Sequence, residues 1–397
     1  AQAWSILKER FFPALPVLMT RVDMVEIREV KNRREIKRFI EFPLNLYKGN
    51  PYFAPPLYSD EKKLFKRNHV YSEQCDTVYY NAYKGGKIQG RISGILQKAS
   101  NEKWKQSRVR FTRFDCVDDI EVAKALFDAV ESWAKLKGMN EVVGPLGFSD
   151  LEREGLLVEG FDYMSTFEEQ YNYAYYQNLI ERCGYAKEVD WVERRIYPPK
   201  EPNDRLKRLS SLMLKRYGLH LCSVKNINEF IEKYADAFFD ILDTTYSQIY
   251  GTVPLSDKMR KMMVSNFRLL VKKDFVSVIL DKDEKVVCFG VCFPSIGEAL
   301  QKSGGRLTPV ALIRVLKAIK KPKMIELGLV GVLPQYESKG ISSALFAGIF
   351  DIFNAYPSVR YAETNLNIED NSKIINQWKN FEHIQHKRRR SYLKQII

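Results

Sequence analysis

The sequence has few of the residues that build disulfide frameworks or metal sites. Among 397 residues there are 6 cysteines and 4 histidines, and no two cysteines are spaced as a CxxC pair. This dispersal argues against a disulfide scaffold and against a zinc centre, so no metal is expected. Reduced thiols fit a cytoplasmic protein. The cysteines are Cys75, Cys116, Cys183, Cys222, Cys288 and Cys292.

Long hydrophobic runs are also missing. The longest apolar stretch near either end covers residues 11–19, and Pro13 and Pro16 interrupt it. That stretch is too short to span a bilayer. Lys8 and Arg10 precede it, which leaves a secretory signal as the alternative, but no small-residue cleavage site follows. The sequence therefore predicts no membrane span and a cytoplasmic location.

Acidic residues are outnumbered, with 49 Asp and Glu against 63 Lys and Arg, which gives a net charge of +14. Such an excess favours phosphorylated or polyanionic partners, although a merely solvated basic surface is the alternative. The basic residues are spread along the chain, and the one tight run covers residues 387–390. No recognition motif accompanies the charge, so nucleic acid is not expected as a partner.

The chain contains one unit that recurs at domain scale. Each half opens with a short strand and a helix, continues with a β-hairpin, and ends with strand, helix, strand and helix. In the first half these elements are expected at residues 25–30, 33–42, 76–82, 88–95, 109–116, 120–137, 141–146 and 173–183. In the second half they are expected at residues 219–224, 227–245, 275–280, 286–293, 324–333, 339–353, 360–366 and 371–381.

This repeat predicts two similar domains in tandem. Because strands alternate with helices, each domain is expected to be α/β (or α+β), with a mixed central sheet flanked by helices. Pro198, Pro199 and Pro202 lie among charged residues and mark the boundary. The expected division is an N-terminal extension at 1–23, a first domain at 24–200 and a second at 201–397.

The sharpest local signal lies in the second half, at residues 332–345. An apolar strand ends at Pro334, a polar turn containing Gly340 follows, and a helix begins with apolar residues on one face. A strand, a glycine turn and a helix N-terminus together present several unpaired backbone N–H groups, which is the geometry that binds phosphate. An ordinary strand-to-helix turn is the alternative.

This segment resembles the acetyl-CoA pyrophosphate loop of the GCN5-related N-acetyltransferase (GNAT) superfamily, Gln/Arg-x-x-Gly-x-Gly/Ala. Here Glu337 stands at the first position and Ser342 at the last, and the central glycine is kept. The resemblance implies an acetyl-CoA, or another acyl-CoA, as co-substrate. It also implies the cofactor-binding residues Val332, Glu337, Ser338, Lys339, Gly340, Ile341, Ser342, Ser343 and Asn371.

The first half resembles the same fold but lacks the loop. Its counterpart at residues 115–120 contains no glycine and carries Asp115, Asp118 and Asp119. Carboxylates at a helix N-terminus cap the helix and repel pyrophosphate. The first domain is therefore interpreted as a degenerate GNAT domain. Residues 50–57 and 154–162 resemble those of a bacterial double-domain acetyltransferase-like subfamily.

Two carboxylates are candidate catalytic bases, because an amine must be neutral when it attacks a thioester. Glu326 precedes the loop and Glu363 lies on the next strand; exposed or ion-paired strand residues are the alternative. Gly328 and Gly331 predict a bulge or splay in the strand between Glu326 and the loop. By the same resemblance, Trp378 lies at the position where the family has a tyrosine that protonates the leaving thiolate.

The resemblance implies an N-acetyltransferase that moves an acyl group from acetyl-CoA directly to an amine. The acceptor would be a small-molecule amine or an amino-acid-like compound. Two alternatives stay open. The donor could be a longer acyl-CoA or an acyl carrier protein, or the protein could bind or sense acyl-CoA without catalysis.

Overall fold

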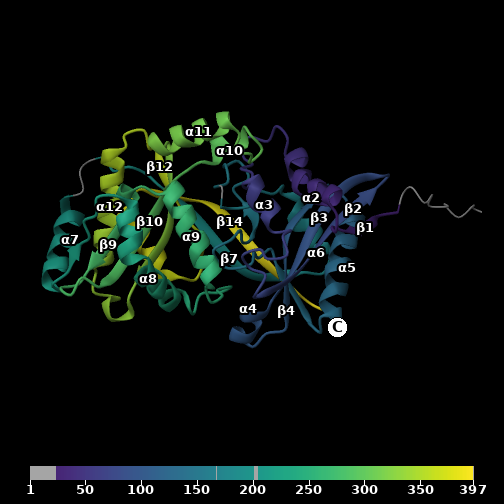
Figure 1. Cartoon of the computed structure of the whole chain (residues 1–397), viewed down its shortest axis with the longest axis horizontal. Helices are drawn as coiled ribbons and strands as arrows, with labels where there is room; N and C mark the ends of the chain where they lie inside the picture. Colours follow the sequence, from purple (N-terminus) through teal and green to yellow (C-terminus); the bar gives the residue numbers. More distant parts are fainter. Residues whose placement is uncertain (1–23, 167, 201–203, 397) are drawn as a thin grey trace, which may run out of the picture.

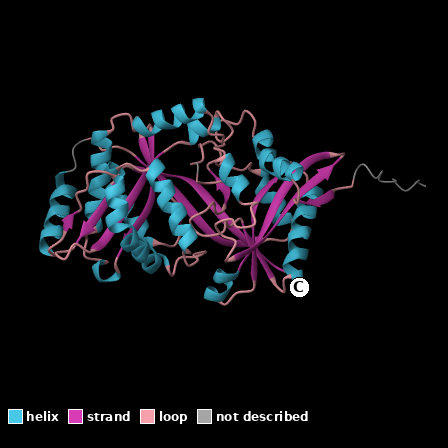
Figure 2. Ribbon diagram, in the orientation of Figure 1, coloured by secondary structure: helices cyan, strands magenta, loops and turns pink. Residues whose placement is uncertain are grey.

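The computed structural model describes residues 24–166, 168–200 and 204–396, and the extension expected at 1–23 lies outside them. Two lobes lie side by side along the long axis of the molecule (Figure 1). One 14-stranded sheet runs through both lobes in the order β1-β2-β3-β4-β5-β14-β7-β12-β11-β10-β9-β8, with β6 added on β14 and β13 on β7. Helices cover this sheet in each lobe (Figure 2).

The first lobe is an antiparallel sheet closed by one parallel crossover. β2 and β3 form a hairpin whose turn places Gly85 and Gly86 at φ 57° and 74°, a conformation that glycine adopts without strain. Asp119 caps the crossover helix, because its carboxylate accepts from the Glu121 amide. The elements are β1(Glu26–Glu29), α2(Arg33–Leu46), α3(Tyr58–Lys63), β2(Cys75–Lys84), β3(Lys87–Gln97), α4(Lys98–Trp104), β4(Arg108–Cys116), α5(Ile120–Leu136), β5(Glu141–Gly144), β6(Leu156–Glu159), α6(Tyr175–Arg182) and β7(Ala186–Ile196).

The second lobe repeats this order. Its strands β9, β10 and β11 are antiparallel, and β11 and β12 are parallel, as are β4 and β5 in the first lobe. The expectation that both halves share one strand order is confirmed. The elements are α7(Asp204–Arg216), β8(His220–Leu221), α8(Ile227–Tyr246), α9(Asp257–Leu270), β9(Val276–Leu280), β10(Val286–Pro294), α10(Gly297–Gln301), α11(Pro309–Lys320), β11(Met324–Val332), α12(Ser342–Ala355), β12(Tyr361–Thr364), β13(Asn367–Ile368), α13(Ser372–Gln377) and β14(His383–Gln395).

The two halves exchange their last strands. β7, from the first half, pairs with β12 and β13 of the second half. β14, from the second half, pairs with β5 and β6 of the first half. β7 and β14 also pair with each other along most of their length. Each half therefore needs the other to complete its sheet.

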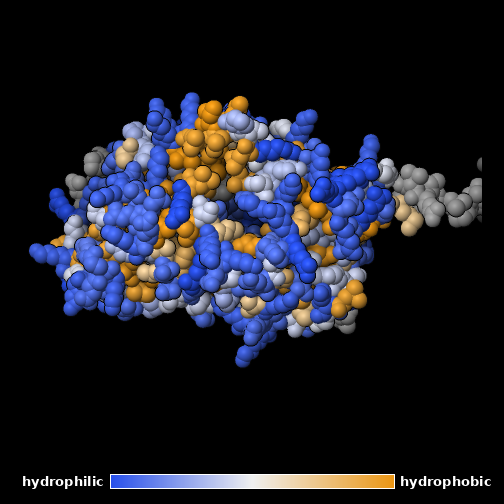
Figure 3. Space-filling model, viewed as in Figure 1, coloured by the Kyte–Doolittle hydropathy of each residue, from blue (hydrophilic) through white to orange (hydrophobic). Residues whose placement is uncertain are grey.

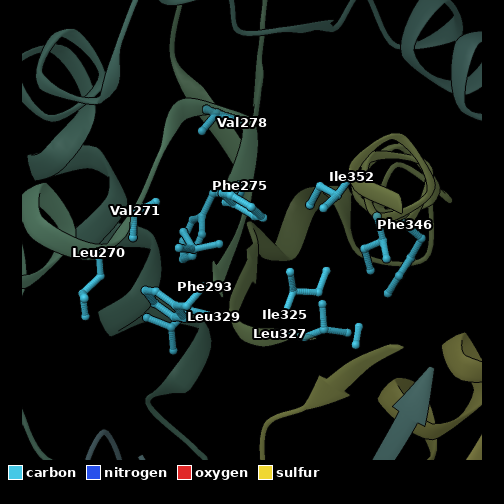
Figure 4. Packing of buried hydrophobic residues seen from close by; sticks show 14 of the residues in the cluster. Leu270, Val271, Phe275, Val278, Phe293, Ile325, Leu327, Leu329, Phe346 and Ile352 are labelled. Atoms are coloured by element: carbon cyan, nitrogen blue, oxygen red, sulfur yellow. The ribbon is translucent and has the colours of Figure 1, made fainter. Parts of the chain in front are cut away.

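The apolar cores follow the same exchange. Ile196, on β7, belongs to the core of the second lobe, and Tyr392 and Ile396, at the end of the chain, belong to the core of the first. Figure 4 shows part of the second core, where Phe293 and Leu329 of the sheet pack near Phe275.

Two other features bear on function. All six cysteines are free thiols, and no helix in the described ranges has the length and apolar character needed to cross a membrane.

The exchanged strands predict that the two lobes unfold together. Phe111 is fully buried in the first lobe and contacts Phe127 and Tyr185. Phe111→Ala should cost about 3–5 kcal/mol of unfolding free energy. Because β7 and β14 link the cores, scanning calorimetry should show the whole transition moving to lower temperature. A separate low-temperature transition for one lobe, with the rest unchanged, would contradict this.

Candidate functional site

The second lobe contains a gap between β11 and β12. Their parallel pairing covers only residues 324–327 and 361–364, because β12 ends at Thr364 whereas β11 continues to Val332. At the same point the pairing of β10 with β11 shifts register, with Val291 opposite Leu329 and Cys292 opposite Leu327, which leaves Gly328 as the bulged residue. A Cβ on Gly328 would lie 2.2 Å from the Phe293 ring. The bulge and splay predicted from the glycines are confirmed.

The loop after β11 leads into α12 with a strained backbone. Ser338 has φ 62° and Gly340 has φ 73°. No side chain caps the first turn of α12, and the Ser343 and Ala344 amides donate to the Gly340 and Ile341 carbonyls at 3.1 and 3.0 Å. Ile341 is 1% exposed and anchors the helix start in an apolar cluster with Leu219 and Val287.

One cavity of about 1280 Å³ connects this loop with the interior of the molecule. Of the residues predicted to bind the cofactor, Lys339 and Ile341 are not part of its wall, and Lys339 instead lies over the rings of Tyr217 and Tyr336. Those that line the cavity are Val332, Glu337, Ser338, Gly340, Ser342, Ser343 and Asn371. The structure thus brings most of the predicted set to one surface.

The cavity passes from one face of the sheet to the other through the gap. On β10, the Phe289 ring packs on Phe238 of α8, whereas the next residue, Gly290, faces Leu345 of α12. Neighbouring residues of a strand point to opposite faces, so α8 and α12 cover opposite sides. The cavity wall includes Leu345 on one side and Tyr246, at the end of α8, on the other.

Loops of the first lobe close the α8 side of the cavity with carboxylates. Burial raises the pKa of Asp150 to about 6, that of Glu168 to about 7 and that of Glu169 to about 8. Burial also raises the pKa of Glu154 well above its ordinary value. Glu154 is 4% exposed, and its Oε1 has no hydrogen-bond partner among the described residues.

Sequence reasoning missed this acidic wall. Residues 154–162 indicated only a subfamily resemblance, and Asp150, Glu152 and Glu154 gave no signal beyond their spacing after β5. Their position at the cavity depends on the strand exchange, because β6, which follows Glu154, pairs with β14. No local pattern in the sequence reports that pairing.

Glu326 lies on β11 just before the gap and is 5% exposed. Its neighbour Leu327 lines the cavity, whereas Glu326 itself is not part of the wall. Burial first, and then the negative charge of Glu168, raise the pKa of Glu326. Its Oε1 has no hydrogen-bond partner among the described residues. A buried carboxyl with a raised pKa is suited to exchanging protons, and the role of base stays a prediction.

Glu363 has a different environment. Its carboxylate accepts from Arg195 Nε at 2.8 Å and from Lys387 Nζ at 3.2 Å, and it lies 2.9 Å from His386 Nε2. Despite burial, Lys387 and these other partners lower the pKa of Glu363 far below its ordinary value. A carboxylate held in this way is a poor proton acceptor, and Glu363 is absent from the cavity wall. The geometry favours a structural role over the predicted catalytic one.

The partners of Glu363 belong to a buried ion-pair network at the β7–β14 pairing. Lys387 also bonds Glu193, and Arg389 bonds Glu193 at 2.7 Å. Glu193, Glu363 and His386 lie close enough together to suit a metal ion. Both carboxylates are, however, already paired with Lys387, so side-chain cations balance the charge there.

Two further side chains occupy the cavity near the gap. The Tyr246 hydroxyl accepts from the Val330 amide at 3.3 Å, and burial raises its pKa to about 12. Tyr246 was not predicted, because it lies far from the loop in sequence. Trp378 donates from Nε1 to Asn367 at 2.9 Å and packs on Phe346.

In the counterpart region of the first lobe, the carboxylates pair with neighbouring side chains and amides. Asp115 accepts from Tyr47 at 2.9 Å and from Arg91 at 2.8 Å. Asp119 caps α5 and pairs with Lys84. These carboxylates have partners within the lobe, as expected for a helix start that does not hold phosphate.

Comparisons with known proteins fit this architecture. No protein-family model matches the chain. It is 26% identical to protein YghO of Escherichia coli over 398 residues, which cover 97% of this chain and 99% of that protein. It is 25% identical to a bacterial ceramide synthase of Caulobacter vibrioides over 345 residues, which cover 82% of this chain and 84% of that protein.

Among solved structures, the chain resembles a tandem GNAT protein from the clavulanic acid biosynthesis pathway. The TM-score is 0.54 at 10% sequence identity, with 94% of this chain and 98% of that chain covered. The chain therefore has the tandem GNAT fold, and the fold expected from the sequence is confirmed.

The network around Glu363 predicts a stability effect. Glu363→Gln should lower the free energy of unfolding by about 3–5 kcal/mol at pH 7, because it leaves buried cations short of a partner. The folded-state pKa is lowered, so this contribution is present above the unfolded pKa of about 4.3 and is lost as the pH falls below it. The difference in unfolding free energy between the variant and the parent protein should therefore shrink below about pH 4. Denaturant unfolding measures this difference.

The matched control is Glu369→Gln. Glu369 pairs with Lys187 and Arg388 but its side chain is 30% exposed, so its loss should cost about 1 kcal/mol or less. Equal stability of Glu363→Gln and the parent protein would contradict the structural role of Glu363.

Proposed function

We propose that this protein transfers an acyl group from an acyl-CoA to an amine. The observation that carries the proposal is one cavity that joins a helix N-terminus without a side-chain cap, a gap in the sheet and an acidic wall. These three regions match the three parts of such a reaction: a pyrophosphate, a thioester and an ammonium group. The tandem GNAT fold and the similarity to a bacterial ceramide synthase support the same reaction class.

The donor end is the loop at 337–343. Backbone N–H groups at the start of α12 would bind the pyrophosphate, because the amides and the helix dipole both favour negative charge. Gly340 provides the turn that points these N–H groups toward the pyrophosphate. The acyl-pantetheine arm would then enter the gap between β11 and β12, where β11 lacks a partner strand. Asn371 lies on the same wall.

The acceptor end is the acidic wall of the first lobe. Asp150 and Glu168, with pKa values of about 6 and about 7, would attract an ammonium group through charge. Glu154, whose pKa burial raises well above its ordinary value, would accept a hydrogen bond with its unpartnered oxygen. The amine must then lose a proton to attack. Its nitrogen forms a bond to the thioester carbonyl carbon, the carbon–sulfur bond breaks, and an amide and free coenzyme A result. The amine proton would pass to Glu168 and from there to Glu326. The Tyr246 hydroxyl would protonate the leaving thiolate.

The cavity favours a longer acyl group over acetyl. Its volume of about 1280 Å³ exceeds the usual range for a small-molecule pocket. Three methionines of α9 line the α8 side, Met259, Met262 and Met263, and Cys292 and Phe293 extend the apolar surface. Methionine adapts to flexible apolar chains. A long-chain acyl-CoA, or a long-chain amine as acceptor, fits this wall.

Binding is tested at Gly340. Gly340→Val should abolish binding of coenzyme A, because a β-branched residue is strained at φ 73° and the loop would lose its shape. Isothermal titration with acetyl-CoA and palmitoyl-CoA should show palmitoyl-CoA binding at least about tenfold more tightly, since each buried methylene adds about 0.8 kcal/mol. Gly138→Val is the matched control, because Gly138 also has a positive φ of 74°, its added Cβ would meet nothing within 4 Å, and it lies outside the cavity wall.

Binding that survives Gly340→Val would contradict the assignment of the loop. Equal affinity for the two donors would favour acetyl-CoA. Tight binding without any acyl transfer to amines would favour the non-catalytic alternative.

Catalysis is tested at Glu326. Glu326→Gln should lower the rate of acyl transfer by about 10²- to 10⁴-fold with little change in donor affinity. Because burial raises the pKa of Glu326, the parent carboxyl is protonated at low pH and the loss should be small there. The loss should be largest above that pKa and shrink again near the pKa of the amine. Release of free coenzyme A thiol measures the rate.

Glu369→Gln serves again as the exposed control and should keep full activity. A Glu326→Gln protein with full activity across the pH range would remove Glu326 from the mechanism.

A further inference from the structure

The solvent face of α11 is unusually apolar for an exposed helix. α11 buries Ala311, Val315 and Ile319 against the molecule. On its outer side, Ile313 is 66% exposed, Val310 56% and Leu316 51%. Leu312 on the helix and Leu307 just before it are also exposed. Figure 3 shows these apolar side chains gathered at the top of the molecule, above the position of α11.

Basic residues surround this apolar face. Arg314, Lys317 and Lys320 lie on the exposed part of α11, and Lys321 follows it. In the described part of the chain, none of these four forms an ion pair. Residues 296–323 contain a single acidic residue, Glu298, and it pairs with Lys323 at 2.7 Å. In the loop before α11, Arg306 pairs with Glu41 of α2.

The helix is held firmly beneath this surface. Thr308 caps α11, and Pro309 occupies its first turn. The preceding α10 is tied to the first lobe, because Gln301 Nε2 donates to the carbonyls of Pro51 and Phe53 at 3.0 Å each. α11 therefore presents its outer face as a fixed surface rather than as a loose segment.

We propose that α11 docks the protein on an anionic lipid bilayer, with its apolar residues in the interface and its basic residues on the lipid phosphates. The chemistry of the face selects this occupant. Apolar residues interleaved with unpaired Lys and Arg, and with no unpaired acid nearby, match the acyl and headgroup layers of a negatively charged leaflet. Long lysine side chains place their stems on apolar surface and their ammonium groups at the headgroups. A net charge of +14 adds long-range attraction.

This inference is independent of the proposed acyl transfer, because α11 contributes no residue to the cavity wall. The test is co-sedimentation of the full chain with vesicles of phosphatidylglycerol and phosphatidylcholine, compared with pure phosphatidylcholine. The parent protein should bind the anionic vesicles and release them at high salt. Ile313→Ser should weaken binding about tenfold, and adding Leu316→Ser should weaken it further. Leu136→Ser, at a position 85% exposed on α5, is the matched control and should bind as the parent does.

A second pair of variants tests the charges. K317E/K320E should weaken binding by at least about tenfold, whereas K282E/K285E, which makes the same change in net charge at the exposed turn between β9 and β10, should have a much smaller effect. Failure of the parent to prefer anionic vesicles would overturn the proposal, as would equal effects of the α11 variants and their controls. So would a parent dimer that Ile313→Ser converts to a monomer, because a second copy of the chain would then cover the face.

Discussion

The rest of the structure depends on the pairing of β7 with β14. These strands lie at the centre of the sheet, and each is bonded to strands of the opposite half. Charged side chains of the pair, such as Glu193 and Arg389, are nearly unexposed, and Arg389 Nε donates to the Glu193 carboxylate at 2.7 Å. A central pair with such specific partners fixes the register of the two halves, since a slip of one residue would bury unpaired charges. The position of every loop at the lobe boundary follows from that register.

The functional cavity is a consequence of the same exchange. Its donor end is built by β11 and α12 of the second lobe, and its acidic end by loops of the first lobe. Neither half alone would close it. The first lobe has the same fold, but its equivalent strand β4 carries Arg113 at a bulge with φ 51° and pairs it with Glu61. At the bulge of β11 in the second lobe, Gly328 instead lies against the Phe293 ring.

Much of this could be predicted from the sequence, and the parts that could not share a reason. The hairpins and crossover helices follow from local periodicity. Gly328 and Gly340 indicated the bulge and the loop, since a side chain at Gly328 would meet Phe293 and the φ of 73° at Gly340 favours glycine. Pairings between residues distant in sequence leave no such local signal. The exchange of β7 and β14 was therefore missed, and with it the place of Asp150 and Glu154 at the cavity and of Glu363 in an ion-pair network. Glu363 was interpreted as a base from its strand position alone, which says nothing about Arg195, 168 residues away.

Net charge gives an incomplete view of such a molecule. The chain carries +14 overall, yet the described loops turn carboxylates toward the cavity at Asp150, Glu154 and Glu168. In a low-dielectric interior an ionised Asp150 or Glu168 acts more strongly on its surroundings than the many solvated lysines outside, because solvent screens the exterior charge. A basic exterior draws anions toward the molecule, whereas an acidic inner wall favours a cation at one end of one cavity. Two reactants of opposite charge would thus be sorted to opposite ends of the gap in the sheet, where the proposed transfer needs them.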